Sequence, residues 1–263
     1  MSKIVVENVK IIKKKSLGRG NFIFEMAPFS KTKSIKPGQF VHIRQPRTNL
    51  LFRRAFSVYD FDAANRTLSI IFKVFGRGTS LMAKLERGAA LDVMGPLGNG
   101  FKYPSKRKTV ILAAGGIGMP PLYLLAKTLL SRGYDPDRIL YFYGGSSKAD
   151  LVDISRIKKL GIRVYPSTDD GSYGFKGFVT DAITDNVDLT NGKHHLYGCG
   201  PEGMLKALDE LALSKNLPGQ LSLEAPMPCG IGICLGCIKP LRAGGYTRIC
   251  REGPVYDVGE VLL

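Results

Sequence analysis

The first hundred residues alternate between apolar and polar positions in short bursts separated by turn residues. Alternation with a period of two places every second side chain on one face of a strand. One helix interrupts the pattern, with Thr79 or Ser80 as its expected cap and Gly88 as its end. We therefore expect an antiparallel barrel or sandwich over residues 1–102. The expected strands cover residues 4–12, 39–44, 55–59, 68–74 and 91–94.

The pattern changes after about residue 103, where continuous apolar runs replace the alternation. These runs predict buried strands, and amphipathic helical stretches lie between them. Strands that alternate with helices predict a parallel sheet with crossover connections, here over residues 103–217. The rest of the chain, residues 218–263, is expected to form a small module that holds most of the cysteines. The expected buried strands cover residues 109–114, 138–144, 162–167 and 194–199.

Four of the five cysteines gather in this last segment. Cys229, Cys234 and Cys237 follow the pattern C-x4-C-x2-C, and Cys250 comes after twelve further residues. This is the ligand spacing of plant-type [2Fe–2S] clusters, and the glycines between the cysteines allow the tight turns that such a site needs. Cys250 would close the site from a hairpin built over Gly244-Gly245. The pattern predicts a protein that transfers electrons.

Other interpretations of the cysteines remain open. A four-cysteine zinc site is the main alternative, although most such sites present two C-x2-C pairs and this segment has one. Two disulfides are less favoured because nothing in the sequence marks the chain as secreted. A metal site at His194-His195 with Cys199 is also disfavoured, because adjacent strand residues face opposite ways.

Composition and charge are those of a soluble globular protein, with 44% hydrophobic and 23% charged residues. The uncharged stretch from Thr109 to Ala126 contains glycines and prolines at its centre, so we expect a strand, a loop and a helix start, not a membrane span. We expect a cytoplasmic protein. The net charge of +16 suits phosphate-bearing cofactors or an acidic partner. No nucleic-acid motif accompanies it, so we expect no nucleic-acid partner.

Three glycine-rich or basic segments are candidates for nucleotide binding. Residues 113–121 (AAGGIGMPP) join a strand to a helix, where backbone amides can approach a pyrophosphate. Residues 197–201 (YGCGP) form a second such junction. A tight structural turn is the alternative for the first segment, and a buried small side chain is the alternative for Cys199. In the barrel, residues 53–57 (RRAFS) and 76–80 (GRGTS) offer an arginine fork, a hydroxyl and backbone amides to a flavin nucleotide.

In this order, the motifs resemble the ferredoxin–NADP reductase superfamily and, more narrowly, the electron transfer subunits of class 1B dihydroorotate dehydrogenases. The resemblance runs nearly end to end. It rests on PGQF (37–40), RR-x-x-S (53–57), DVMGPLGNGF (92–101), GGIGMPPLY (115–123), TDDGSYGFKG (168–177), the cysteine module and Glu252-Gly253-Pro254.

The resemblance implies FAD, NAD(H) and a [2Fe–2S] cluster, with site residues carried over by position. FAD is assigned to Arg54, Ala55, Phe56, Ser57, Phe72, Lys73, Val74, Gly78 and Thr79. NAD(H) is assigned to Gly115, Gly116, Gly118, Thr168, Asp169, Cys199, Gly200 and Pro201. The cluster is assigned to Cys229, Cys234, Cys237 and Cys250.

Departures from the family pattern affect two of the FAD assignments. Relatives commonly show a glycine-acidic stretch where Gly76-Arg77-Gly78-Thr79 stands, so the phosphate contact differs in detail. Relatives often carry Pro-Ile where Ala55-Phe56 stand, and the wider superfamily has a tyrosine at Phe56; a phenylalanine can still stack on a flavin. NADP-dependent members carry Ser-Arg where Thr168-Asp169 stand. A carboxylate repels a 2′-phosphate and accepts a hydrogen bond from a 2′-hydroxyl, so NAD is expected, although Asp169-Asp170-Gly171 can also be a turn.

The resemblance implies an oxidoreductase subunit of pyrimidine (UMP) biosynthesis. Electrons from the FMN of a dihydroorotate dehydrogenase catalytic subunit would pass through the cluster and FAD to NAD⁺, in a heterotetramer with two copies of each chain. An alternative is the electron-transfer subunit of a sulfhydrogenase or of an NADH-dependent ferredoxin reductase. Some of those relatives replace the first cysteine ligand with aspartate, and Cys229 argues mildly against them. An unrelated alternative is a zinc-stabilised nucleic-acid-binding protein.

Overall fold

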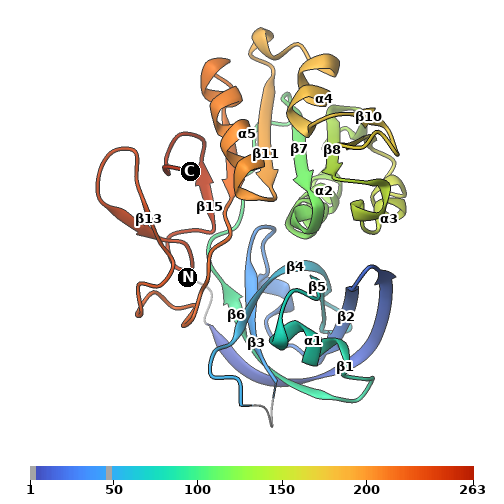
Figure 1. The fold of residues 1–263 in the computed structure, drawn as a ribbon, viewed down its shortest axis with the longest axis vertical. Coiled ribbons are helices and arrows are strands. Elements are labelled where there is room, and N and C mark those ends of the chain that lie inside the picture. Colours follow the sequence, from blue (N-terminus) through green and yellow to red (C-terminus); the bar gives the residue numbers. More distant parts are fainter. Residues whose placement is uncertain (1–3, 46–48) are drawn as a thin grey trace.

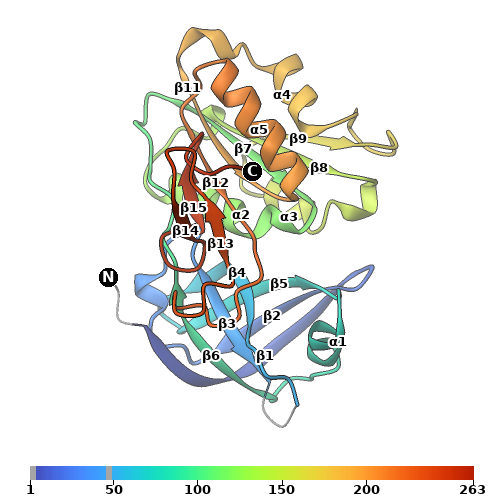
Figure 2. The ribbon, with the colours of Figure 1, turned by 60° about the vertical axis from the view of Figure 1, so that its left-hand side comes forward.

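The computed structural model describes residues 4–45 and 49–263. A closed barrel lies at one end of the molecule, and a sheet flanked by helices lies at the other (Figure 1). The C-terminal segment runs down beside both, so that it contacts the barrel and the sheet (Figure 2). The expected fold class is confirmed. Among the described residues, no helix is both long enough and apolar enough to cross a membrane.

The barrel is antiparallel, and its strands are hydrogen-bonded in the order β1-β2-β5-β4-β3-β6. Their inward side chains form one apolar core that includes Phe24, Phe56 and Phe72. Strand β2 is not among the example stretches that the alternating pattern marks. The strands are β1 (Val5–Gly18), β2 (Asn21–Ala27), β3 (Phe40–Arg44), β4 (Arg54–Asp62), β5 (Thr67–Lys73) and β6 (Ala90–Leu97).

The barrel's helix α1 (Arg77–Ala83) begins earlier than expected. Gly76 is its N-cap, so the expectation of a cap at Thr79 or Ser80 was wrong. The Thr79 hydroxyl lies in the first turn, where it accepts hydrogen bonds from the backbone N–H of Phe75 at 2.8 Å and of Gly76 at 3.2 Å. These bonds satisfy two donors of the turn that leads into the helix.

The second half of the chain forms a sheet in the order β10-β9-β8-β7-β11-β12-β15, parallel except for β15. Alternate residues of β7 enter two separate cores, one with α2 and α3 and one with α4 and α5, so helices cover both faces. The elements up to α5 are β7 (Thr109–Gly115), α2 (Met119–Ser131), β8 (Ile139–Gly145), α3 (Ile154–Lys158), β9 (Arg163–Thr168), β10 (Phe175–Lys176), α4 (Val179–Asn186), β11 (His194–Cys199) and α5 (Glu202–Ser214).

The cysteine segment is not separate from this sheet. Its strands β12 (Gly219–Ser222) and β15 (Val255–Asp257) extend the sheet beyond β11. Between them, β13 (Ile238–Pro240) and β14 (Tyr246–Arg248) form the expected hairpin over Gly244-Gly245. The division of the chain at 102/103 and 217/218 stays a prediction; residues 1–3 of the first part lie outside the described residues, as do 46–48.

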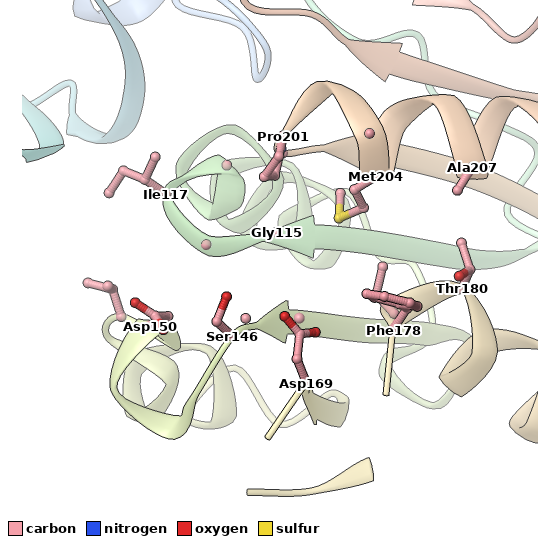
Figure 3. Close-up of a pocket in the computed structure, with 18 of the residues that line it drawn as sticks. Gly115, Ile117, Ser146, Asp150, Asp169, Phe178, Thr180, Pro201, Met204 and Ala207 are labelled. Atoms are coloured by element: carbon pink, nitrogen blue, oxygen red, sulfur yellow. The ribbon is translucent and has the colours of Figure 1, made fainter. Parts of the chain in front are cut away.

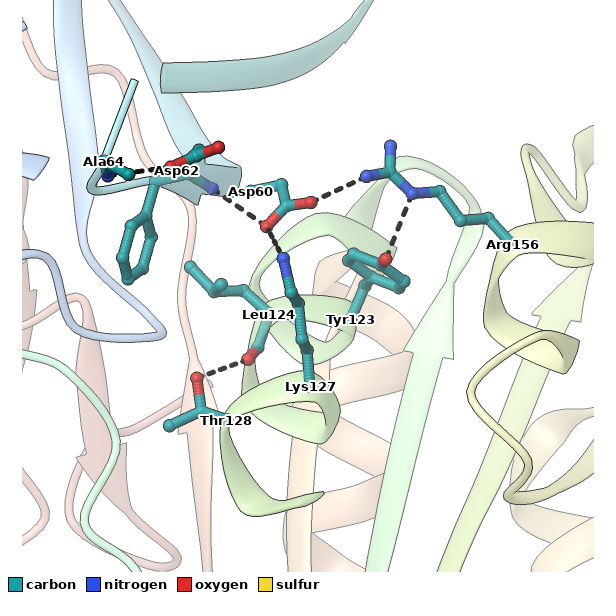
Figure 4. Close-up of polar contacts among 9 residues, drawn as sticks. Asp60, Asp62, Ala64, Tyr123, Leu124, Lys127, Thr128 and Arg156 are labelled. Atoms are coloured by element: carbon teal, nitrogen blue, oxygen red, sulfur yellow. Dashed lines mark hydrogen bonds and ion pairs between the residues drawn. The ribbon is translucent and has the colours of Figure 1, made fainter. Parts of the chain in front are cut away.

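A polar network joins the barrel to the sheet. Asp60 on β4 accepts hydrogen bonds from Lys127 on α2 and from Arg156 on α3, each at 2.6 Å (Figure 4). Arg156 also donates to the hydroxyl of Tyr123 at 3.0 Å. Tyr59, the neighbour of Asp60, packs its ring against Tyr123 in the same apolar core. The orientation of the two halves is therefore fixed by both packing and charge.

Candidate functional site

The four clustered cysteines approach one another in two pairs. The thiol of Cys234 acts on the pKa of Cys229, and that of Cys237 acts on the pKa of Cys250, whose backbone N–H also donates to Sγ of Cys237 at 3.5 Å. Burial acts to raise the pKa of Cys229. Hydrogen bonds from the backbone of the loop outweigh burial and lower this pKa to about 6. Burial and the neighbouring Cys237 raise the pKa of Cys250 to about 12.

This arrangement of two and two fits a two-iron cluster. In a [2Fe–2S] cluster each iron takes two cysteine sulfurs, whereas a structural zinc ion takes four ligands at one point. The donor set therefore suits [2Fe–2S] better than zinc.

The loop that carries the first three cysteines depends on left-handed backbone. Gly230 has φ +70° and Gly232 has φ +83°, a conformation that side chains other than glycine rarely adopt. Arg248 on β14 donates to the carbonyl of Gly232 at 3.0 Å and forms an ion pair with Glu252. The hairpin thus braces the cysteine loop from the side of Cys250.

A cavity of about 440 Å³ lies where the barrel meets the sheet and the cysteine segment. Five of the residues assigned to FAD line it, from the neighbouring strands β4 and β5, and Pro120 at the start of α2 faces them. Its opposite wall, from Ser222 to Met227, leads into the cysteine loop. The five assigned residues are Ala55, Phe56, Ser57, Phe72 and Lys73.

The aromatic rings at this cavity are placed differently from the expectation. Phe56 is only 9% exposed and its ring packs against Phe72 inside the barrel, with 5.9 Å between ring centroids. This position does not favour the expected stacking of Phe56 on a flavin. Phe75, which the sequence analysis did not select, is 96% exposed and lines the same cavity. An aromatic ring that is open to a cavity is suited to stack on a planar ligand.

The other residues assigned to FAD lie beside the cavity. Arg54 and Gly78 contact each other so closely that a Cβ on Gly78 would lie 2.4 Å from Nε of Arg54. The carbonyl of Gly78 also accepts a hydrogen bond from Gln45 at 2.8 Å. The structure thus brings the arginine fork and the start of α1 together, as a phosphate contact would require. Val74 lies just before the turn that leads into this helix, and Thr79 lies in the first turn of the helix.

A larger cavity of about 690 Å³ opens at the carboxyl ends of β7, β8, β9 and β11 (Figure 3). This edge of a parallel sheet is where nucleotides bind in such folds. Gly116 has φ +49° and no atom within 4 Å of the position of a Cβ, so its backbone is open for close approach by a ligand. The residues assigned to NAD(H) that line the cavity are Gly115, Gly116, Gly118, Asp169, Gly200 and Pro201.

The glycine loops of this cavity pack on each other. A Cβ on Gly118 would lie 2.4 Å from the carbonyl oxygen of Cys199, and one on Gly200 would lie 3.0 Å from the backbone of Gly115. Only glycines allow the strand–helix junctions after β7 and β11 to touch. The two segments that the sequence analysis selected separately therefore form one wall.

Two of the residues assigned to NAD(H) do not line the cavity. The side chain of Cys199 is 1% exposed, and burial raises the pKa of its thiol. Thr168 is also buried, and its hydroxyl bonds to the backbone N–H and carbonyl of Tyr173, each at 3.0 Å. Asp169 does face the cavity, across from Pro201 and Met204 (Figure 3).

Three residues line both cavities: Lys73 on β5, Ile117 after β7 and Glu224 after β12. The two cavities are therefore neighbours, and ligands in them can approach each other. Protein atoms around Glu224 desolvate its carboxyl group and raise its pKa. This meeting point is where a hydride would have to cross from one planar ring to another.

Comparison with known proteins finds matches in two segments of the chain and along nearly its whole length. Residues 224–262 match the family model described as the iron–sulfur cluster binding domain of dihydroorotate dehydrogenase B, and residues 112–210 match the oxidoreductase NAD-binding domain. The dihydroorotate dehydrogenase B (NAD⁺) electron transfer subunit of Fusobacterium nucleatum is 41% identical over 98% of this chain and 96% of its own. The subunit of Streptococcus mutans is 34% identical over 99% of both chains.

This chain belongs to the family of dihydroorotate dehydrogenase B electron transfer subunits. A solved structure described as an NADH-dependent reduced ferredoxin–NADP oxidoreductase superposes with a TM-score of 0.85 at 29% identity, covering 97% of this chain and 89% of that one. A ferredoxin NADP⁺ reductase from Neisseria gonorrhoeae, with bound FAD and NADP, shares the fold with a TM-score of 0.68 at 19% identity, over 80% of this chain and 91% of its own.

Three residues that line the cavities lie outside the motifs from which the site residues were assigned. Phe75 follows the assigned stretch from Phe72 to Val74 by one position, and its exposure is visible only in the structure. Phe178 is 67% exposed and lines the larger cavity near Asp169 (Figure 3). Glu224 precedes the first cluster cysteine by five residues, and no local pattern distinguishes it from a surface glutamate.

Proposed function

We propose that this chain is the electron-transfer subunit of an NAD-dependent dihydroorotate dehydrogenase, and that it passes electrons from a catalytic subunit to NAD⁺ in pyrimidine biosynthesis. The observation that carries the proposal is the line of three neighbouring sites: the paired cysteines, the smaller cavity and the larger cavity. When bound, FAD supplies the chemistry that joins single-electron transfer by a [2Fe–2S] cluster to hydride transfer with NAD(H).

The barrel residues would hold the flavin. Ser57 offers a hydroxyl to the ring system, and Lys73 offers a cation at the meeting point of the two cavities. Arg54, with the backbone around Gly78, would take the pyrophosphate, and Phe75 would cover a planar ring. The +16 charge of the chain favours ligands with several phosphates.

The glycine wall of the larger cavity would hold NAD(H). Gly116 leaves room for the pyrophosphate beside the helix start at Met119. Asp169 would accept from a ribose 2′-hydroxyl and repel a 2′-phosphate, which is why NAD is preferred over NADP. Ile117 and Glu224 would border the nicotinamide and help to exclude water between the two ring systems.

Cys229 and Cys234 would bind one iron of the cluster, and Cys237 and Cys250 the other. Backbone N–H groups of Gly236 and Cys250 already point at the sulfurs of Cys234 and Cys237, each at 3.5 Å. Such contacts stabilise negative charge on a cluster and thereby influence its potential. The loop therefore contributes both ligands and electrostatic support.

A subunit of this kind works with a catalytic partner, and the surface around the cysteines suits docking. Large apolar side chains are exposed there, which is unusual for a surface without a partner. We propose that this face meets a catalytic subunit carrying FMN, in a heterotetramer with two of each chain, and that the complex is cytoplasmic. The exposed apolar residues are Ile233, Leu235, Ile238 and Tyr246.

The solved structure with a TM-score of 0.85 favours a second candidate, a subunit of an NADH-dependent ferredoxin–NADP oxidoreductase. Its identity of 29% is lower than the 34–41% of the dihydroorotate dehydrogenase relatives. The two candidates share the fold and differ in the partner. Co-expression with each type of partner therefore separates them.

The proposal is tested by co-expressing the chain with a dihydroorotate dehydrogenase catalytic subunit and assaying reduction of NAD⁺ by dihydroorotate. We expect the two chains to co-purify and to reduce NAD⁺, with NADP⁺ a poor substitute. Substitution of Leu235 and Tyr246 by aspartate should weaken co-purification while leaving flavin content unchanged. A complex that forms only with a ferredoxin-linked partner would favour the second candidate instead.

A further inference from the structure

His42 on β3 is fully buried, yet its imidazole has no hydrogen-bond partner among the residues that the structure describes. It is 0% exposed, and both Nδ1 and Nε2 are unpaired. Buried polar groups in proteins are nearly always hydrogen-bonded, and leaving one unpaired costs about 1–3 kcal/mol. An imidazole in this position therefore indicates that something else completes its environment.

The surroundings of His42 show where that missing group would be. Its ring lies directly against Gly230 of the cysteine loop, where a Cβ would be 2.6 Å from both Cε1 and Nδ1. Gly230 follows the first cluster cysteine, Cys229. The ring of Phe40 approaches His42 edge-on with 5.7 Å between centroids, and Phe40 also lines the smaller cavity.

The side of the barrel wall on which His42 lies follows from the strand register. His42 is directly opposite Ala55 on β4, and side chains opposite each other on neighbouring strands share a face. Ala55 lines the smaller cavity. His42 thus projects from the barrel wall toward the space between the flavin cavity and the cysteine loop.

Sulfur is the acceptor that this place offers. A neutral imidazole carries one N–H donor, and burial together with the nearby cation of Arg53 disfavours the charged form. The sulfides and cysteine sulfurs of an iron–sulfur cluster accept hydrogen bonds, and each such bond raises the reduction potential of the cluster. The loop around Cys229 lies against His42, so a cluster held by that loop would offer these acceptors to the N–H of His42.

We propose that the N–H of His42 donates a hydrogen bond to a sulfur of the bound cluster and raises its reduction potential. The inference rests on the proposed function, since it requires the cluster. It assigns a role in electron transfer to a barrel residue that no cysteine motif includes. His42 links the flavin-binding barrel to the cluster through space, without contributing a ligand.

Selective labelling tests this directly, because the chain contains only three histidines. His194 and His195 begin β11 and pair with the first residues of β7. This end of the two strands points away from the barrel (Figure 1). Holoprotein grown with ¹⁵N-histidine and reduced anaerobically is examined by pulsed EPR. We expect a ¹⁵N coupling to the reduced cluster that is present in wild type and in His195→Leu and absent in His42→Leu.

A redox titration gives the second readout. Loss of the hydrogen bond in His42→Leu should make the cluster harder to reduce by about tenfold, which is 59 mV for one electron. A cluster signal without histidine coupling in the labelled wild type overturns the role of His42. A protein with no cluster signal at all contradicts the proposed function instead. The wild-type measurement stands even where His42→Leu fails to fold.

Discussion

Two of the contacts between the barrel and the rest of the molecule differ in how well their polar groups are satisfied. At the first, Asp60 accepts from Lys127 and Arg156 at 2.6 Å and from the backbone N–H of Phe61 at 2.9 Å (Figure 4). At the second, His42 lies against Gly230 with both ring nitrogens unpaired. Among the residues that the structure describes, the first contact has partners for its polar groups and the second does not.

The same distinction separates two glycines of the larger cavity. Gly118 packs against the backbone of Cys199, whereas the space beside Gly116 is open. Positions that the protein itself completes hold the two halves together, and positions that it leaves incomplete are those where ligands are expected. Substitutions at the two kinds of position should therefore separate loss of stability from loss of ligand.

The largest effect is expected for Gly230→Ala. A methyl group there must adopt φ +70° and would lie 2.6 Å from the ring of His42. We expect about 3 kcal/mol of destabilisation from backbone strain and overpacking together, with loss of bound iron. Gly244→Ala, with φ +94° and no atom within 4 Å, is the matched control and should cost only about 1 kcal/mol.

A double substitution sharpens this prediction. If the methyl group of Gly230→Ala acts through His42, then His42→Ala should recover part of the lost stability. Thermal unfolding of the four variants gives the coupling energy. Purely additive effects would show that the contact between the two residues is unimportant.

Asp60→Ala should reduce stability by about 2 kcal/mol, because it leaves two cations of the interface unpaired. This loss of stability is smaller than that expected for a fully buried ion pair, because the side chains of Lys127 and Arg156 are 46% and 36% exposed. Urea unfolding measures the change. Lys102→Ala, which removes an exposed pair with Asp257, is the control and should change stability by less than about 0.5 kcal/mol.

Gly118→Ala and Gly116→Ala should act in different ways. The first would place a methyl group 2.4 Å from a backbone oxygen and should destabilise the protein by about 2 kcal/mol. The second adds a methyl group to open space at φ +49°, with about 1 kcal/mol of strain, and should weaken NADH binding instead. Thermal unfolding and NADH titration, done side by side, check both. If both variants lost the same affinity for NADH, Gly116 would not be the residue that contacts the nucleotide.

Asp169→Ala should have the smallest effect on stability and should change only the choice of nucleotide. Removing the carboxylate removes its repulsion of a 2′-phosphate, so the preference for NADH over NADPH should fall by about tenfold, or 1.4 kcal/mol. The ratio of kcat/KM for the two nucleotides measures this. Asp170→Ala is the matched control, because its side chain bonds to Ser172. An unchanged ratio in Asp169→Ala would support the interpretation of this segment as a turn.

Local patterns in the sequence were sufficient for the fold class and for the grouping of four cysteines in one segment. Alternation marks barrel strands, and apolar runs bounded by glycine mark the parallel sheet. The addition of β12 and β15 to that sheet could not be predicted, because each is short and its partner strand is distant in the sequence. The sequence pattern of a single short strand is too weak to indicate which other strand it pairs with.

The candidate site was predicted where backbone geometry requires a residue type, and missed where only the tertiary contact matters. Gly116 and Gly118 are visible in the sequence because a strand–helix junction needs glycine. His42, Phe75 and Glu224 occupy ordinary positions in their segments, and only folding brings them to the cavities and the cysteine loop. The burial of Phe56 was missed because strand register decides which face a side chain takes.

The most direct test of the account is an EPR spectrum of the anaerobic, cofactor-loaded protein after addition of NADH. The account predicts the signal of a reduced [2Fe–2S] cluster, with far less signal from the same amount of NADPH. Replacement of Cys237 by serine should alter or abolish it. A protein that binds iron and flavin, and shows the cluster signal with dithionite but none with NADH, would contradict the proposed path between nucleotide and cluster.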